Sequence, residues 1–392
     1  MFVANRVPYP PYRGDKLKIW NLAKRLCKEH ELHLFTIAQS KEELQQAEIL
    51  KTVFKEVHII FLPKWKSLFK VALAVFSKIP FQVAYFRSSS FLKLLQDHLQ
   101  KHAYDAIHIQ HLRMGWYFQK LNRQNAVLDL PDAFSLYWQR RVEMAKWPWV
   151  KIFTRIEQRR LLQMEKNILP TFPLTLVCSE EDKQYLLSHA QANIQILPNG
   201  VDTDTYYPRT DLKPEPFRIL FTGNMDYAPN IDAVAYFCHE LLPKIKETHP
   251  AVVFVIAGQR PVKRVLDLAC EYVQVTGFVK NLTEEYARAA VVVAPLRFGA
   301  GTQNKVLEAL AMGIPVVCTR VGFKGLGLNN GEGIIMADTS DTFANAVIDL
   351  LESEANRSRI SGQGLQKVVA TFGWDAVSTK LIQYLKSVEH KL

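Results

Sequence analysis

The chain alternates short apolar runs with amphipathic stretches over most of its length. Runs such as 174–179 and 252–258 are rich in Val, Ile and Leu, which indicates strands buried on both faces of a sheet. Most of these runs are followed by stretches whose apolar residues recur at helical spacing. Strands that alternate with helices predict parallel sheets covered by helices on both faces, so we expect an α/β fold.

The predicted elements form two successive sets. The first set has strands over residues 2–5, 32–37, 57–62, 105–111, 127–132, 174–179 and 194–197, with helices that include 42–51 and 135–169. The second set has strands over 218–223, 252–258, 273–277, 291–294 and 315–318, with helices over 231–245, 262–270, 282–289, 342–353 and 375–388. Between the sets, the segment 198–202 and the acidic, proline-rich stretch that ends at Pro216 break the pattern.

This division suggests two domains, because 392 residues are more than one hydrophobic core usually supports. We expect a Rossmann-like domain over residues 1–200 and a second over residues 201–372. A C-terminal helix over residues 373–392 can pack back on the first domain.

Residues 291–319 run in the order strand, glycine loop, helix, strand. The loop Phe298-Gly299-Ala300-Gly301-Thr302 leads into a helix N-terminus, where free backbone N–H groups and the helix dipole can hold a phosphate. Lys305 and Glu308 are three residues apart in this helix and therefore share a face. An ordinary βαβ unit with an exposed Lys–Glu pair gives the same pattern, and the spacing alone does not separate the two interpretations.

Positive charge is concentrated in the first half of the chain. Residues 1–200 hold 29 Lys and Arg against 17 Asp and Glu, a net charge of +12, whereas residues 201–392 hold 20 against 21. Such an excess can serve nucleic acid, an anionic membrane surface or an anionic substrate. Nucleic-acid-binding motifs are absent from the sequence, so we favour the membrane surface.

The segment 64–94 mixes aromatic and basic residues at helical spacing, which is typical of a helix at a membrane interface. These residues are Trp65, Phe69, Phe76, Phe81 and Phe86, with Lys64, Lys66, Lys70, Lys78, Arg87 and Lys93. The alternative is a helix pair that buries its aromatic rings and exposes its lysines. A signal peptide and an apolar run of about 18 residues are both absent, so we expect a cytoplasmic protein, peripheral on the inner face of the membrane.

Five motifs together resemble one enzyme family. They are Pro198-Asn199-Gly200-Val201-Asp202, Thr222-Gly223, Val255-Ile256-Ala257-Gly258, Thr276-Gly277-Phe278-Val279, and the stretch from Pro295 to Val317. Their order strongly resembles the group 1 glycosyltransferases, the retaining family 4 with the GT-B fold. The first half is similar more loosely, through Pro8 to Asp15 and its strand-end histidines. The resemblance implies two Rossmann-like domains that face each other across a cleft, the first for an acceptor and the second for a nucleotide-sugar donor.

The resemblance also implies roles for individual residues. Glu308 would bind the ribose diol, because the two oxygens of a carboxylate accept from two adjacent hydroxyls. The strand end at Thr276, Gly277, Phe278 and Val279 would bind the base. The residues expected to line the sugar and phosphates, or to let the backbone approach the donor, are Gly14, Gly223, Asn224, Gly299, Ala300, Gly301, Thr302 and Gln303. For Gly14, an ordinary turn glycine is an equally good interpretation.

The sequence departs from the family pattern at three points. Ala300 stands where the family has the first of two paired glutamates. The arginine and lysine that usually follow the strand ending at Gly223 are missing, so Arg297 and Lys305 become the candidate catalytic cations that offset charge on the leaving diphosphate. In the first half we favour His111 over His108 as the catalytic-site histidine, with a hydrogen-bonded core histidine as the alternative.

The predicted function is transfer of a sugar, with retention, from a nucleotide-diphosphate sugar to a cell-envelope, exopolysaccharide or lipid-linked acceptor. The resemblance implies that no metal and no further cofactor are needed. Two alternatives are a nucleotide-sugar epimerase of the same fold and a non-catalytic scaffold that binds sugar nucleotides.

Overall fold

The computed structural model describes residues 1–11, 14–119, 121, 124–145, 147–299 and 303–389. The chain forms two compact units. Unit 1 consists of Met1–Pro198 and Val377–Leu392, and unit 2 of Asn199–Ala376.

Unit 1 is built on a parallel sheet that has seven strands in the described residues, in the order β3-β2-β1-β4-β5-β6-β7. The strands are β1 (Phe2–Ala4), β2 (His33–Ala38), β3 (Glu56–Phe61), β4 (Ile107–Gln110), β5 (Ala126–Leu130), β6 (Leu174–Val177) and β7 (Ile194–Ile196). Phe2 of β1 pairs with Leu34 on one side and with His108 on the other. The strand order therefore reverses between β1 and β4, and ligands of doubly wound sheets bind beyond the strand ends at such a switch point.

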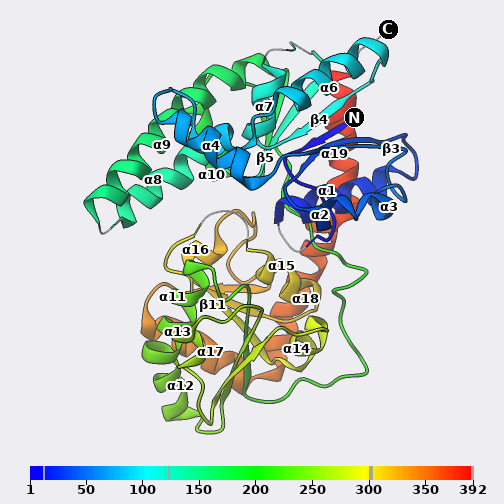
Figure 1. The fold of residues 1–392 in the computed structure, drawn as a ribbon. Coiled ribbons are helices and arrows are strands. Elements are labelled where there is room, and N and C mark those ends of the chain that lie inside the picture. Colours follow the sequence, from blue (N-terminus) through cyan, green and yellow to red (C-terminus); the bar gives the residue numbers. More distant parts are fainter. Residues whose placement is uncertain (12–13, 120, 122–123, 146, 300–302, 390–392) are drawn as a thin grey trace. The chain divides into compact units, whose positions relative to one another are not determined.

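Helices cover this sheet (Figure 1). They are α1 (Gly14–Leu26), α2 (Lys41–Leu44), α3 (Ala47–Leu50), α4 (Lys64–Ala74), α5 (Phe81–Phe86), α6 (Ser89–Lys101), α7 (Leu112–Phe118), α8 (Phe134–Met144), α9 (Pro148–Ile168), α10 (Glu180–Leu187) and α19 (Trp374–Val388), with a 3₁₀ turn at Leu169–Thr171. The Tyr384 hydroxyl of α19 donates to the Ile196 carbonyl at 3.2 Å, so this helix packs beside β7.

Two helix predictions in unit 1 were wrong in length. The stretch 135–169 is not one helix but the pair α8 and α9, which lie side by side in Figure 1. Pro148 begins α9, and its missing N–H is tolerated in a first helical turn but not in a helix interior. The stretch 42–51 likewise forms the two single-turn helices α2 and α3.

Unit 2 repeats the plan, with six parallel strands among its described residues in the order β10-β9-β8-β11-β12-β13. The strands are β8 (Arg218–Thr222), β9 (Val253–Ala257), β10 (Val273–Gly277), β11 (Val291–Ala294), β12 (Val316–Cys318) and β13 (Ile334–Met336). Its helices are α11 (Ala228–Tyr236), α12 (Leu242–Thr248), α13 (Lys263–Leu266), α14 (Leu282–Arg288), α15 (Asn304–Ala311), α16 (Arg320–Phe323), α17 (Ser340–Glu352) and α18 (Glu354–Phe372), with a π-helical turn at Phe237–Leu241. The expected α/β class with two Rossmann-like domains is confirmed.

Three further predictions in unit 2 need correction. The helix expected over 231–245 is divided by the π turn, which precedes Pro243, a residue without an N–H for the regular ladder. The helix expected over 262–270 is the single turn α13. The 19-residue helix α18 was missed, because glycines weaken its helical pattern. Gly364 is needed there, since a Cβ on it would lie 2.6 Å from the Gly333 Cα.

Candidate functional site

The switch point of unit 2 lies between β8 and β11, and most of the predicted donor residues follow these two strands. Gly223 and Asn224 come directly after β8, and Arg297 and Gly299 lie in the segment that joins β11 to α15. The topology therefore brings the motif residues to the edge of the sheet where a ligand is expected.

Two glycines let the strand ends at this edge pack backbone against backbone. A Cβ on Gly258, which follows β9, would lie 1.7 Å from the Gly223 carbonyl oxygen. A Cβ on Gly223 would lie 2.6 Å from Nδ2 of Asn230, and both glycines have positive φ, +153° for Gly223 and +158° for Gly258. Only glycine fits either position, so the edge beside β8 is lined by main chain.

Glu308 is held in place by a neighbouring tyrosine. It lies on α15, and its Oε2 accepts a hydrogen bond of 2.8 Å from the hydroxyl of Tyr286 on α14. The same hydroxyl is 2.7 Å from Oγ1 of Thr222, the last residue of β8. Burial raises the pKa of Glu308, while the Tyr286 hydrogen bond and Lys305 oppose the rise. The carboxylate is therefore fixed beside the end of β8, with oxygen lone pairs left to accept from a ligand.

Lys305 is a buried cation at the same edge. Its Nζ donates to Oδ1 of Asn230 at 2.9 Å and lies 4.6 Å from the centroid of the Phe221 ring. Burial lowers the pKa of Lys305 to about 8, and the Glu308 carboxylate limits the fall. Asn230 in turn donates through Nδ2 to the Asn224 carbonyl at 3.0 Å. An ammonium has three donors, so the group can still donate to an anionic ligand.

Arg297, the other predicted cation, already has a counter-charge. Its Nε and Nη2 donate to the two carboxylate oxygens of Asp232 at 2.9 and 2.6 Å, a bidentate pair. The guanidinium also lies 4.8 Å from the centroid of the Tyr236 ring. Since Asp232 balances its charge, Arg297 is a weaker candidate than Lys305 for stabilising a diphosphate, and its role stays a prediction.

The remaining donor residues lie on loops. Thr276 and Gly277 end β10, and the next residue, Phe278, leaves 73% of its surface exposed, so its ring is free to stack on a planar base. Gln303 is the N-cap residue of α15 and makes no side-chain capping bond. Ala300, Gly301 and Thr302 lie outside the described residues, and their roles stay predictions, as do those of Val279 and Gly299.

At the switch point of unit 1, His111 and His108 occupy different environments. His111 follows β4 in a left-handed conformation, with φ of 84°, and its ring stacks on Phe134 at 4.1 Å. Burial, followed by Arg113 and Arg6, lowers the pKa of His111 well below its usual value, so the ring is neutral. Such strain in a non-glycine residue is frequent at functional sites.

His108, in contrast, belongs to the buried interior of unit 1. Its Nε2 is 3.0 Å from Oδ2 of Asp129, whose Oδ1 accepts from Lys18 Nζ at 2.8 Å. All three side chains are buried, which is the arrangement expected of a paired core cluster, although Nδ1 of His108 has no hydrogen-bond partner among the described residues. His111 thus lies at the strand end where a ligand is expected, but its side chain is buried and its catalytic role stays a prediction.

Two other residues of unit 1 bear on the predictions. Gly14 is the first residue of α1, and a Cβ on it would meet no atom within 4 Å, so its predicted donor contact stays a prediction. Asp132, two residues after β5, was missed by the sequence analysis. Burial and the nearby Asp182 raise the pKa of Asp132 to about 7. Its position just beyond a strand end was the signal that could have identified it.

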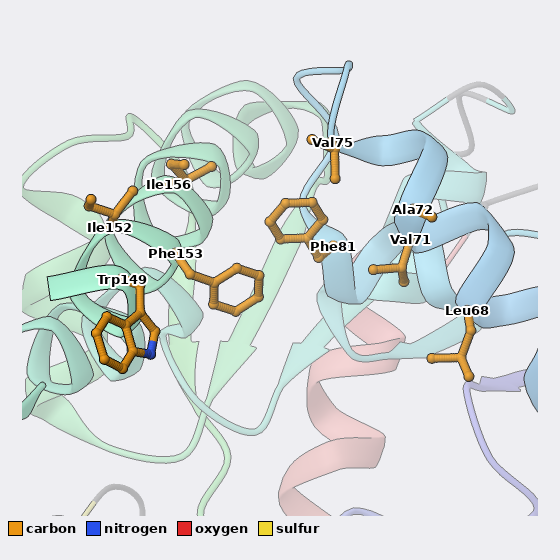
Figure 2. A pocket seen from close by; sticks show the side chains of 9 residues that line it. All are labelled: Leu68, Val71, Ala72, Val75, Phe81, Trp149, Ile152, Phe153 and Ile156. Atoms are coloured by element: carbon orange, nitrogen blue, oxygen red, sulfur yellow. The ribbon is translucent and has the colours of Figure 1, made fainter. Parts of the chain in front are cut away.

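Unit 1 also carries an apolar groove of about 460 Å³ between α4, α5 and α9, which we call the α4–α9 groove. It is lined by Leu68, Val71, Ala72, Val75, Phe81, Trp149, Ile152, Phe153 and Ile156 (Figure 2). Figure 2 shows Phe81 and Phe153 turned toward each other, and their rings stack at 5.1 Å.

The groove belongs to a larger exposed apolar surface. It includes Trp65, Leu68, Phe69, Leu73, Val75, Phe76, Trp147, Trp149, Ile152, Phe153 and Ile156, of which Phe76 is 93% exposed. Exposed cations border it at Lys64, Lys66, Lys78, Lys151, Arg155 and Arg159. Residues 61–80 and 147–156 contain no Asp or Glu. Large apolar patches on protein surfaces usually mark contacts with other proteins or with membranes.

This surface agrees only in part with the prediction made for residues 64–94. Trp65, Phe69 and Phe76 are exposed, whereas Phe81 and Phe86 are buried, so only the last two fit the helix-pair alternative. Contact of the exposed rings with a membrane stays a prediction. The contribution of α9 was missed, because the prediction covered only the segment 64–94. Across the described part of the chain, each helix is too short or too polar to span a membrane.

Each unit matches one family model. Residues 19–205 match the family model described as Glycosyltransferase Family 4. Residues 216–353 match the model described as Glycosyl transferases group 1.

Three curated relatives illustrate the range of similarity. A glycogen synthase of Mycobacterium tuberculosis is 29% identical over 208 residues, which are 49% of this chain and 48% of the synthase. A GDP-mannose-dependent alpha-(1-6)-phosphatidylinositol monomannoside mannosyltransferase of the same species is 27% identical over 219 residues, 50% of this chain and 56% of the relative. An uncharacterised 44.6 kDa protein in the cps region of Klebsiella pneumoniae is 22% identical over 374 residues, 92% of each chain. This chain therefore spans about half the length of the first two relatives.

Two solved structures share the architecture. Sucrose-phosphate synthase from Thermosynechococcus elongatus superposes with a TM-score of 0.70 at 17% identity, over 99% of this chain and 98% of that one. HepE of Anabaena, solved in complex with UDP, superposes with a TM-score of 0.68 at 14% identity, over 98% and 99%. Each unit thus matches a different glycosyltransferase family model, and the chain shares the two-domain GT-B architecture of these solved structures.

Proposed function

We propose that this protein transfers a sugar, with retention, from a nucleotide-diphosphate sugar to a lipid-linked or other cell-envelope acceptor at an anionic membrane surface. The observation that carries the proposal is the pairing of a fixed carboxylate, Glu308, with a buried cation, Lys305, at the switch point of unit 2. The carboxylate suits the ribose diol of a nucleoside diphosphate, and the ammonium suits its phosphates.

In this proposal Glu308 accepts hydrogen bonds from the ribose hydroxyls, and Tyr286 keeps the carboxylate in the required orientation. The exposed ring of Phe278 stacks on the base. The main chain beside Gly223 and Gly258 lets the donor approach closely. The UDP complex of HepE supports this choice of ligand, since that protein shares the fold.

Lys305 stabilises the leaving diphosphate. Charge accumulates on the phosphate oxygens as the glycosidic bond breaks, and a cation in a desolvated site stabilises that charge more than an exposed one does. The helix dipole at the N-terminus of α15 adds to the same effect. We therefore propose that the reaction needs no metal ion, and that the acceptor attacks the face from which the diphosphate leaves.

Unit 1 supplies the acceptor side and the membrane contact. The apolar surface around the α4–α9 groove has a cationic border and no acidic residue in its two segments, which suits an anionic lipid surface. The name of the phosphatidylinositol mannoside mannosyltransferase points to a lipid acceptor for that relative and supports one here. The protein would then act at the inner face of the cytoplasmic membrane.

The test is a transfer assay with the purified full-length chain, a panel of nucleotide sugars and lipid-linked acceptors in anionic vesicles. We expect release of a nucleoside diphosphate that depends on the acceptor, and a product with the anomeric configuration of the donor by NMR. Conversion of the donor without an acceptor would instead favour the epimerase. Binding of nucleotide sugars without turnover would favour the scaffold.

A further inference from the structure

Several histidines gather near the amino ends of strands in the unit 1 sheet. His111 lies at the opposite, carboxyl ends of the strands. His33 and Glu56 are the first residues of β2 and β3, and His98 lies in the last turn of α6. His58, His102 and Tyr104 adjoin them, with the His98 ring 4.9 Å from that of His58 and 4.2 Å from that of His102. The glycosyltransferase function assigns no role to this end of the sheet.

The potential ligand atoms converge on one small volume. One nitrogen of His33, one of His98 and a carboxylate oxygen of Glu56 all lie within 4.8 Å of one another. Nδ1 of His33 is 3.7 Å from Oε2 of Glu56. The Tyr104 hydroxyl lies between the two imidazoles, 2.8 Å from Nδ1 of His33 and 2.6 Å from Nε2 of His98. His33 and His98 are only 7% and 8% exposed, so their rings are held by packing.

Hydrogen bonds with neighbouring carboxylates orient His33 and His58. Nε2 of His33 is 3.1 Å from Oε1 of Glu31, which favours the tautomer that carries the proton on Nε2 and leaves the Nδ1 lone pair facing the cluster. Nε2 of His58 lies 2.9 Å from Oε2 of Glu56. A carboxylate that orients a histidine in this way is the usual outer shell of a protein metal site.

We propose that His33 Nδ1, His98 Nε2 and the Glu56 carboxylate form a binding site for a divalent transition metal of the Zn²⁺ class. Two imidazoles and one carboxylate are ligands that zinc prefers, whereas magnesium and calcium prefer oxygen ligands alone. The Tyr104 hydroxyl or a water molecule supplies the fourth position. Zinc bonds of about 2.0–2.1 Å place tetrahedral ligand atoms roughly 3.4 Å apart, which small side-chain rotations would reach from the present separations.

The bound ion would join three elements that are distant in sequence, the starts of β2 and β3 and the end of α6. Because a metal that binds only the folded state stabilises it by mass action, the ion would raise the thermal stability of unit 1. It would lie at the amino ends of the strands, opposite the carboxyl ends where ligands of such sheets bind, so its role is structural. The family resemblance implied that no metal is needed for the reaction, and this separate site was not predicted, because its ligands come from separate elements and form no local motif.

The test uses the full chain, free of any affinity tag and treated with a chelator. Zinc is then titrated in competition with a chromophoric chelator, and thermal unfolding is followed with and without zinc. We expect one tight equivalent per chain, a zinc-dependent rise in Tm, and a tetrahedral visible spectrum with Co²⁺. Glu31→Gln should weaken zinc binding about 10- to 100-fold, as outer-shell changes do, and Glu56→Gln and His98→Gln by more.

His30→Gln, an exposed histidine outside the cluster, is the matched control and should bind zinc as the wild type does. If His98→Gln fails to fold, the partly exposed Glu56→Gln carries the test. A wild type without a saturable one-to-one site, or Glu56→Gln binding as tightly as wild type, would overturn the proposal and leave a hydrogen-bonded cluster bridged by Tyr104. Nucleotide binding measured on the same samples reports on the donor site separately.

Discussion

The hydroxyl of Tyr286 donates a 2.8 Å hydrogen bond to Oε2 of Glu308, and it also touches the side chain at the end of β8. A tyrosine on one helix thus orients a carboxylate on another at the point where the strand order of unit 2 reverses. The hydrogen bond opposes the rise that burial causes in the pKa of Glu308, so it favours the ionised form that a ribose diol requires.

Tyr286→Phe should therefore weaken nucleotide binding without abolishing it. Loss of one hydrogen bond to a charged group costs about 1.5–3 kcal/mol, roughly 10- to 150-fold in affinity. The pKa of Glu308 should rise further, so the affinity of the variant should fall at a higher pH than that of the wild type as the solution is acidified. Calorimetric titration over a pH series measures both effects. Tyr207→Phe, at an exposed tyrosine of unit 2, should change neither, and a Tyr286→Phe protein that binds like the wild type would refute this role.

The pKa of Lys305 predicts an alkaline limit for donor binding. The folded protein without ligand holds this pKa at about 8, below the ordinary 10.5, because the ammonium is buried. Below pH 8 the group is charged and attracts phosphate, and above pH 8 it loses its proton. Bound diphosphate raises the pKa, so affinity should fall by up to about tenfold per pH unit above 8 until the pKa of the complex is reached. Lys305→Met should bind more weakly at neutral pH and show no such fall in the same window.

Gly258→Ala should destabilise unit 2. The added Cβ would lie 1.7 Å from the Gly223 carbonyl oxygen at a positive φ, so two strand ends must separate. Overpacking of this kind costs about 1–3 kcal/mol or more, and donor binding should weaken with it because we propose the donor site at the same strand ends. Gly14→Ala has open space around its Cβ and is the control that should leave stability nearly unchanged. Equal thermal unfolding of the two variants would mean that the clash relaxes at little cost.

The exposed surface of α4 and α9 should bind anionic membranes. Each cation near an anionic surface contributes about 1 kcal/mol, which salt screens, so vesicle binding should require anionic lipid and decline as salt rises. Phe76→Ser combined with Trp149→Ser should reduce vesicle co-sedimentation strongly while leaving nucleotide affinity unchanged. Phe278→Ser removes an exposed ring from unit 2 and should leave vesicle binding intact. Binding to neutral vesicles alone, or binding that the double variant retains, would contradict the assignment of this surface.

Buried strands and the glycine motifs were the features that the sequence predicted best. Strands such as β9 and β11 are apolar on both faces, so their pattern does not depend on which neighbours they pair with. The helix α18 was not predicted, because its glycines have low helix propensity. Gly364 is present for tertiary packing, since a larger residue would clash with Gly333. The break between α8 and α9 was missed although Pro148 marks it, because the apolar spacing continues on both sides.

Side-chain partnerships in the site were harder to predict. Nothing in the sequence favoured Arg297 or Lys305 over the other as the catalytic cation. In the structure Arg297 pairs with Asp232, 65 residues away, whereas Lys305 donates to the side-chain amide of Asn230. The cluster of His33, Glu56 and His98 was missed for the same reason, since its members meet only after the sheet has formed. Predicting such contacts needs the three-dimensional register of elements that are distant along the chain.

We propose above all that Glu308 anchors a nucleoside diphosphate in unit 2. Calorimetric titration of the wild type with UDP, GDP and ADP, repeated for Glu308→Gln, tests it most directly. We predict one-to-one binding of at least one nucleotide to the wild type and a loss of about 1.5–3 kcal/mol, roughly 10- to 150-fold in affinity, for Glu308→Gln. Glu354→Gln, at an exposed carboxylate of α18, should bind as the wild type does. Equal affinity of Glu308→Gln and wild type, or no binding of any of the three nucleotides, would contradict the claim.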